Sequence, residues 1–169
     1  MSTAWRDALW GQFGAAIDML ENAVKECPDD VWGDRPGFHE FWYLVYHTLF
    51  FLDYYLSDSD QGFAPPAPFT LSELDPAGVL PDRVYSKEEL LAYLRHGREK
   101  ARAIVASLTD ATSAAHPAFG PIDTSVAEFL MYSLRHVQHH AGQLQLLLRQ
   151  RIDRAPRWVR RAGDPLGGA

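Results

Sequence analysis

The sequence contains one cysteine, Cys27, among its 169 residues. A single cysteine excludes a disulfide framework within the chain and a CxxC zinc or redox motif, so any metal has to be held by His, Asp or Glu. It also fits a reducing, cytoplasmic setting. The chain has no phosphate-binding glycine loop, dinucleotide fingerprint or Ser-His-Asp arrangement, and these absences argue against several common enzyme classes.

Long uncharged apolar segments are also missing. No window approaches the roughly 18 apolar residues that a membrane span needs. The N-terminal stretch MSTAWRDALWGQFG has no basic region followed by a long apolar one, as a signal peptide would. We therefore expect a soluble cytoplasmic protein with no membrane partner. Its length and its 47% hydrophobic residues suit one domain over residues 1–169.

Positive charge is scarce, with 16 Lys and Arg against 22 Asp and Glu and a net charge of −6. This balance argues against a surface built to hold nucleic acid phosphates. The exception is the segment 149–161, which holds six Arg and one Asp. We expect a solvated tail that offsets the acidic remainder. Nucleic acid binding by this tail is the weaker hypothesis, and it predicts binding that weakens steeply with salt.

Four segments have the three- and four-residue apolar spacing of helices, at about 4–26, 38–57, 86–108 and 124–150. Apolar residues surround the second of them on nearly every side, so it should be largely buried. Ser86 and Glu89 form a capping-box pattern at the start of the third. No alternating strand pattern is convincing. The sequence thus predicts an all-α four-helix bundle with a tail over 151–169.

The connection between the second and third predicted helices, residues 57–85, contains five prolines and has no helical period. Such a long connection is normally a functional loop or a crossover. Nearly thirty extended residues easily cross the roughly 30 Å length of a 20-residue helix. The second and third helices can then run parallel, which gives an up-down-down-up order.

The stretch RHVQHHAGQ in the last predicted helix is the most informative about chemistry. At about 100° per residue, His140 lies roughly 55° and His136 roughly 95° from the centre of the buried stripe. His139 lies roughly 160° from it and should face water. His136 and His140 are one turn apart on one flank, an arrangement that offers two imidazoles to one metal ion.

A third ligand has to come from another helix, and His47 is the natural candidate because it lies at a similar height. His96 falls far from the apolar stripe of its own helix, whereas His39 and His116 lie too far along the bundle. A lone buried histidine is usually a hydrogen-bonded core residue, but three together without a metal would each need a polar partner. Three neutral imidazoles suit a divalent transition metal: zinc or nickel first, with copper and iron as alternatives.

Polar neighbours could orient these ligands. The candidates are Glu40 and Tyr54, each about two turns from His47, and Tyr132 and Gln143, which lie near the pair on the last helix. Each of the four has a plain alternative role as a helix cap or a satisfied core group. Asp53 points roughly 120° away from His47 and is a poor co-ligand.

Three segments of the chain together resemble the DinB-like superfamily of four-helix-bundle metal-binding proteins. They are FWYLVYHTLFFLDYYL, LPDRVYSKEELLAYL, and RHVQHHAGQLQLLLR followed by APRWV. The resemblance covers essentially the whole chain. It implies an up-down-down-up bundle, often a homodimer, with a three-histidine site at His47, His136 and His140. It also implies relatives among thiol-dependent S-transferases and maleylpyruvate isomerases, which use low-molecular-weight thiols.

Two hypotheses about function follow. In the first, the protein is an enzyme whose metal activates water or a small thiol for hydrolysis or transfer, with the 57–85 connection able to cover the site. In the second, the histidines are structural and the protein is a non-catalytic, dimeric stress-response or binding module. Its contacts would then come from exposed aromatic residues such as Trp10, Trp32 or Trp158.

Overall fold

The computed structural model describes residues 2–34, 40–120 and 123–166. It contains four long helices, α1 (Thr3–Glu26), α3 (Phe41–Tyr55), α4 (Lys87–Ser107) and α6 (Val126–Ile152). Shorter helices are α2 (Asp29–Trp32), α5 (Asp110–Ala114) and the 3-10 helix η1 (Ser72–Leu74). The described residues form no β-strand. Their β pairing is limited to an isolated bridge between Ser59 and Ala118. The prediction of an all-α protein is confirmed.

Each long helix begins and ends within three residues of its predicted bounds. The predicted capping box is present, because the Ser86 hydroxyl accepts from the Glu89 amide and the Glu89 carboxylate accepts from the Ser86 amide. Ser125 caps α6 in the same position, accepting from the amide of Glu128. The predicted start of the second helix at residue 38, and His39, lie outside the described residues.

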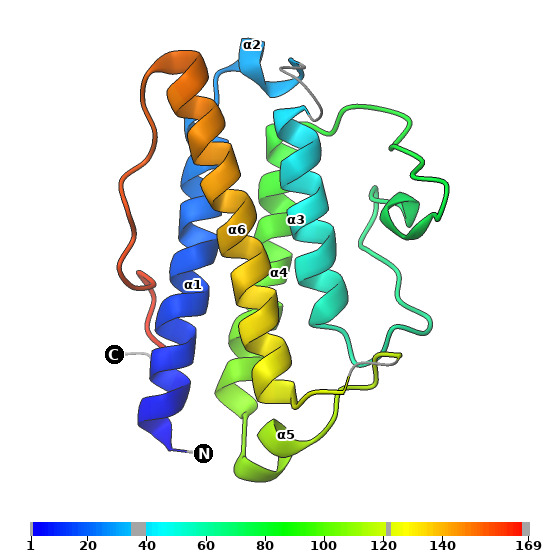
Figure 1. Ribbon diagram of the computed structural model, residues 1–169, viewed down its shortest axis with the longest axis vertical. Helices are drawn as coiled ribbons and strands as arrows, with labels where there is room; N and C mark the ends of the chain where they lie inside the picture. Colours follow the sequence, from blue (N-terminus) through cyan, green and yellow to red (C-terminus); the bar gives the residue numbers. More distant parts are fainter. Residues whose placement is uncertain (1, 35–39, 121–122, 167–169) are drawn as a thin grey trace.

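The four long helices form a closed ring of neighbours (Figure 1): α1 packs against α4 and α6, and α3 packs against the same two. The chain rises through α1, descends through both α3 and α4, and rises again through α6. The connection between α3 and α4 returns along the outer side of α3. No helix within the described ranges has the length and apolar character needed to cross a membrane.

The core fills the space between these helices with fully buried aliphatic side chains, among them Leu20, Val45, Leu49, Leu94 and Leu144. Close contact between α3 and α4 depends on Gly97, where a Cβ atom would lie 2.9 Å from Cδ2 of Leu52. Cys27 is buried too, and burial is the main cause that raises its pKa to about 12. The only thiol of the chain therefore stays protonated near neutral pH.

Two of the three aromatic residues expected at the surface are buried. Trp10 is 1% exposed and Trp32 is 7% exposed. The Trp10 indole donates to the carbonyl of Asp164 at 2.6 Å, and the Trp32 indole donates to the carbonyl of Tyr85 at 2.9 Å. Segments distant in sequence therefore cover both rings. Trp158 is exposed, as expected.

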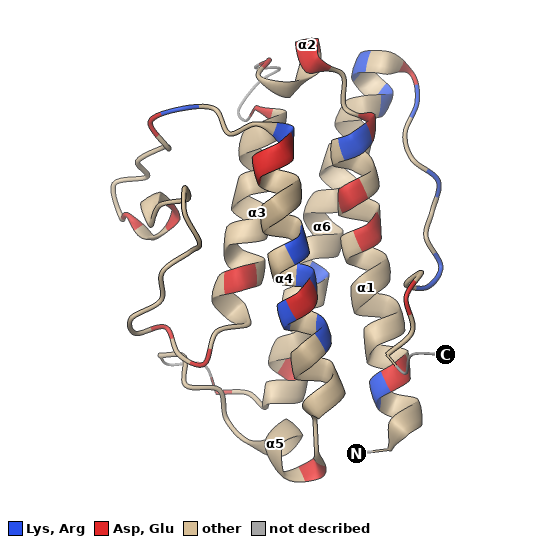
Figure 2. Ribbon diagram, turned by 180° about the vertical axis from the view of Figure 1, so that it is seen from behind, with Lys and Arg blue, Asp and Glu red and all other residues tan. Residues whose placement is uncertain are grey.

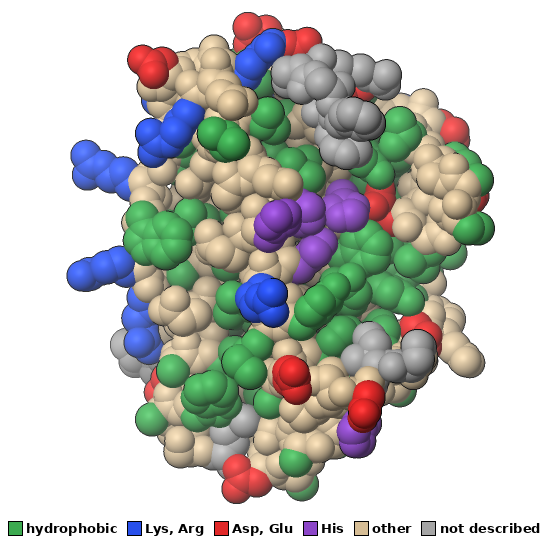
Figure 3. Space-filling model, viewed as in Figure 1, with side chains coloured by type: hydrophobic (Ala, Val, Ile, Leu, Met, Phe, Trp, Pro, Cys, Tyr) green, Lys and Arg blue, Asp and Glu red, His purple; other side chains and the backbone are tan. Residues whose placement is uncertain are grey.

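The C-terminal segment 153–166 runs back along α1 and packs its backbone against that helix, a contact that its composition does not indicate (Figure 1). Its Ala162 amide donates to the carbonyl of Gly11 at 2.9 Å. A Cβ atom at Gly14 would lie only 2.6 Å from Cβ of Ala162, so the close approach requires glycine there. The arginine side chains of residues 149–161 are exposed, as expected of a solvated basic segment. Basic positions follow this edge of the ribbon in Figure 2, and basic side chains follow it in Figure 3.

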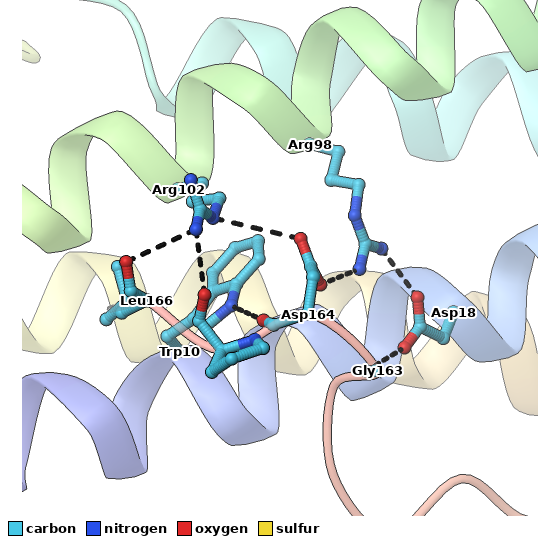
Figure 4. Close-up of polar contacts among 8 residues, drawn as sticks. Trp10, Asp18, Arg98, Arg102, Gly163, Asp164 and Leu166 are labelled. Atoms are coloured by element: carbon cyan, nitrogen blue, oxygen red, sulfur yellow. Dashed lines mark hydrogen bonds and ion pairs between the residues drawn. The ribbon is translucent and has the colours of Figure 1, made fainter. Parts of the chain in front are cut away.

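Asp164 lies at the centre of a polar network that fixes this segment to two helices (Figure 4). Its carbonyl accepts the Trp10 indole hydrogen bond, and its carboxylate pairs with Arg98 of α4. Arg98 also donates to the carboxylate of Asp18 on α1 at 2.6 Å. The segment thus bridges α1 and α4 and shields Trp10 from water.

Candidate metal centre

Three histidines lie together where α3 packs against α6. His47 comes from the middle of α3, and His136 and His140 come from consecutive turns of α6. One ring nitrogen of each lies within 4.8 Å of the other two. All three side chains are half-buried, and histidines gather on the face shown in Figure 3. The three residues predicted as ligands are therefore close enough together to share one ion.

A carboxylate from the long connection orients His47. Nδ1 of His47 lies 2.6 Å from Oε2 of Glu73 in η1, and the Glu73 side chain is only 3% exposed. An ionised carboxylate accepts from Nδ1–H, which leaves the lone pair of the ring on Nε2. The His47 ring also packs against Phe51, with 4.9 Å between the ring centroids. Carboxylates commonly hold metal-binding histidines in this way.

His140 is oriented by a neighbour on its own helix. Its Nδ1 lies 2.7 Å from Oε1 of Gln143, so the amide oxygen accepts the Nδ1 proton and the lone pair of the ring stays on Nε2. This Nε2 lies 3.1 Å from Nε2 of His136. Two nitrogens bound to one tetrahedral zinc at about 2.0–2.1 Å lie about 3.3 Å apart. The spacing of the pair thus fits a shared ion.

His136, the other member of this pair, is half-buried. Burial is the main cause that lowers its pKa from 6.5 to about 3, and the neighbouring imidazoles lower it further. Its ring is therefore neutral near pH 7, as a metal ligand has to be. Its Nδ1 is buried and has no hydrogen-bond partner within the described part of the chain. The donor set of three imidazoles fits a divalent transition metal.

The other three histidines that the structure describes do not join this cluster. His139 follows the prediction and is exposed, with its ring centroid 5.0 Å from that of His140. His116 lies between α5 and α6 and is exposed. His96 of α4 faces Asp53, with 3.3 Å between Nε2 and Oδ1.

The four residues predicted to orient the ligands differ in whether they contact the histidine cluster. Gln143 makes the expected contact with a ligand. Glu40 instead accepts from the indole of Trp42, and Tyr54 packs against Phe63 and Phe119. Tyr132 reaches the site indirectly, because it packs on Tyr55, whose ring centroid lies 5.8 Å from that of His136.

Asp53 is directed away from the cluster of His47, His136 and His140, as predicted, and toward His96 of α4. It is 2% exposed and accepts from Tyr93 at 3.1 Å and from Nζ of Lys100 at 2.6 Å. Both donors belong to α4, so this carboxylate links α3 to α4.

Glu73 is the residue of the candidate site that the sequence pattern missed. It lies in a connection without helical period, and no spacing rule relates it to His47. Two contacts place it: the Phe69 ring stacks on Tyr93 with 4.3 Å between centroids, and the Tyr46 hydroxyl donates to the carbonyl of Thr70 at 2.8 Å. Both anchors lie three to four residues before Glu73 and hold the connection against α3 and α4.

Comparison with known proteins agrees with this geometry. A family model described as the DinB superfamily matches residues 12–144, from within α1 to within α6. The matched range includes all three histidines of the cluster and Glu73. Neither a curated protein nor a solved structure matches the chain. Because the family match spans most of its length, the chain belongs to the DinB superfamily.

Proposed function

We propose that this protein is a metal-dependent enzyme in which His47, His136 and His140 bind one divalent transition ion, zinc or nickel ahead of iron. The observation that carries the proposal is the convergence of one nitrogen from each ring within 4.8 Å. The proposal includes an up-down-down-up four-helix bundle as the scaffold, which the helix directions in Figure 1 support.

An ion held by three imidazoles keeps positions open for water or a thiol and lowers the pKa of the bound group. The residues of the chain prepare the site for this chemistry. Glu73 and Gln143 hold protons at Nδ1 of two ligands, which directs their Nε2 lone pairs to the centre. Phe51 and Tyr55 pack around His136, with centroid distances of 5.7 and 5.8 Å, and limit access of water from that side.

The reaction class that we propose is hydrolysis by an activated water or S-transfer by a small activated thiol. Family membership and the half-buried, partly open position of the histidines support it. We also propose that the protein acts as a homodimer on a small-molecule substrate. The competing hypothesis is a non-catalytic dimeric module with structural histidines.

Metal content tests the proposal directly. Protein purified from zinc- or nickel-supplemented growth should carry about one ion per chain by elemental analysis, because one three-histidine centre is present. A divalent ion, and a small thiol added after it, should each raise the melting temperature, since ligands that select the native state stabilise it. Protein that carries no ion, and that no divalent ion stabilises, would overturn the proposal.

Glu73→Ala should weaken zinc binding by about 10- to 100-fold, the usual cost of losing a group that orients a metal-binding histidine. The cause is the loss of the carboxylate that fixes the proton on Nδ1 of His47. Competition with a chromophoric chelator measures the affinity. Asp82→Asn, an exposed carboxylate in the same connection, is the control and should bind zinc as the unchanged protein does. Equal affinity in Glu73→Ala would show that Glu73 does not orient the ligand.

A further inference from the structure

A pocket of about 580 Å³ lies beside the histidine cluster. Tyr55 of α3 forms one wall, and residues of the first half of α6 form the other, including Phe129, Tyr132 and Arg135. The Tyr55 ring lies 5.8 Å from that of His136 and 5.3 Å from that of Tyr132. Pocket and histidine cluster therefore share a wall. Hydrophobic side chains also border the histidines in Figure 3.

The walls of this pocket are flat and apolar. The rings of Phe129 and Tyr132 are within 12° of parallel, and the Tyr55 ring meets both edge-on at centroid distances of 5.3–5.4 Å. Tyr132 and Met131 are nevertheless exposed, at 47% and 39%. Aromatic surfaces of this kind favour stacked or edge-to-face contact with another ring. A flat apolar molecule would cover the rings that water now contacts.

The two ends of the pocket carry side chains of opposite charge. Arg135 is exposed, lines the pocket at the end next to His136, and makes no ion pair with any residue that the structure describes. Glu128 lines the pocket two turns earlier on α6, about 10 Å along the helix axis at 1.5 Å per residue. An anionic group is therefore attracted to the histidine end of the pocket and repelled from the other end. Arginine pairs well with carboxylates, because its fork of donors matches two oxygens.

We infer that this pocket binds an organic carboxylate with a flat apolar body, the carboxylate at Arg135 and the body between Tyr55, Phe129 and Tyr132. The volume lies within the roughly 300–1,000 Å³ of pockets that take small molecules. The inference depends on the proposed function in one respect, which is the assignment of this molecule as the substrate. In the inferred orientation its carboxylate lies beside His136. Binding itself depends on side chains of the chain alone.

The test uses 2-naphthoate and its neutral analogue methyl 2-naphthoate, titrated by calorimetry against the full chain after chelator treatment. The carboxylate should bind about tenfold more tightly than the ester, because a charge-assisted pair with Arg135 stabilises only the anion. Arg135→Gln should remove this preference and leave ester binding unchanged. Tyr132→Ala should weaken both ligands about equally. Arg157→Gln, an exposed arginine outside the pocket, is the matched control and should change neither affinity.

Failure of this inference is distinct from failure of the proposed function. If the protein holds an ion but binds the carboxylate no more tightly than the ester, the pocket assignment is overturned and the metal proposal stands. If no ion binds but the carboxylate preference depends on Arg135, the pocket stands and the metal proposal falls. Analytical ultracentrifugation of the unchanged protein and of Tyr132→Ala measures the oligomeric state. If the unchanged protein is a dimer that Tyr132→Ala dissociates, and if it does not bind 2-naphthoate, this face is the contact with a second copy and the inference is overturned.

Discussion

His136→Ala should abolish tight zinc binding, with a loss larger than the roughly 100-fold upper cost of removing a group that only orients a ligand. Burial lowers the pKa of His136 to about 3, so its ring is neutral near pH 7 and can bind a metal ion. His47→Ala should cause a loss of similar size, although it lies on the other helix, since each ring supplies one of three nitrogens. Chelator competition and loss of zinc-induced thermal stabilisation measure both variants.

His139→Ala is the matched control. It removes an imidazole from the same turn of α6, but that side chain is exposed and outside the cluster. Zinc affinity should stay unchanged. If His47→Ala also keeps full affinity, the ion is held by α6 alone and the three-histidine centre is wrong. If a triple His→Ala variant keeps its dimer and its melting temperature both with and without added zinc, the histidines have no structural metal role either.

The sequence was sufficient for the part of the site that lies on one helix. His136, His139 and His140 occupy fixed directions around α6, so periodicity alone separates the two cluster members from the exposed one. His47 required one further assumption, that the midpoints of two long helices lie at a similar height. That assumption worked because α3 and α6 are direct neighbours in the bundle.

Contacts between distant segments could not be derived in this way. Glu73 reaches His47 only because Phe69 and Tyr46 anchor a connection that has no period of its own. Tyr54 shares a face with His47 by sequence, but two turns separate them, and aromatic residues from outside α3 enclose it. Trp10 has the spacing of a helix residue, yet its cover is the backbone at Asp164. In each case the local spacing determines the direction of a side chain, whereas the tertiary fold determines which residue it contacts.

Asp53→Ala should lower the free energy of unfolding by about 3 kcal/mol, near the lower end of the roughly 3–5 kcal/mol for breaking a buried ion pair. We expect a cost near the lower end of this range because the Lys100 side chain is partly exposed to water. Its ammonium also keeps two other acceptors, the Asp53 carbonyl at 2.9 Å and the Ser57 hydroxyl at 2.8 Å. The Tyr93 hydroxyl loses its acceptor entirely. Burial and the charge of Asp53 raise the pKa of Tyr93, so that hydroxyl stays protonated and in need of an acceptor.

Urea unfolding followed by circular dichroism, on protein freed of metal by a chelator, measures this cost without any contribution from the histidine cluster. Asp53→Asn keeps an oxygen acceptor and should lose less than Asp53→Ala. Asp58→Asn removes an exposed carboxylate just beyond the same end of α3 and should stay within about 0.5 kcal/mol of the unchanged protein. If Asp53→Ala matched Asp58→Asn, this polar contact would not hold α3 against α4, and packing such as that of Leu52 on Gly97 would have to do so alone. The expected loss instead makes Asp53 a structural counterpart of the histidine face: α3 is fixed to α4 through Asp53, and so presents His47 to α6.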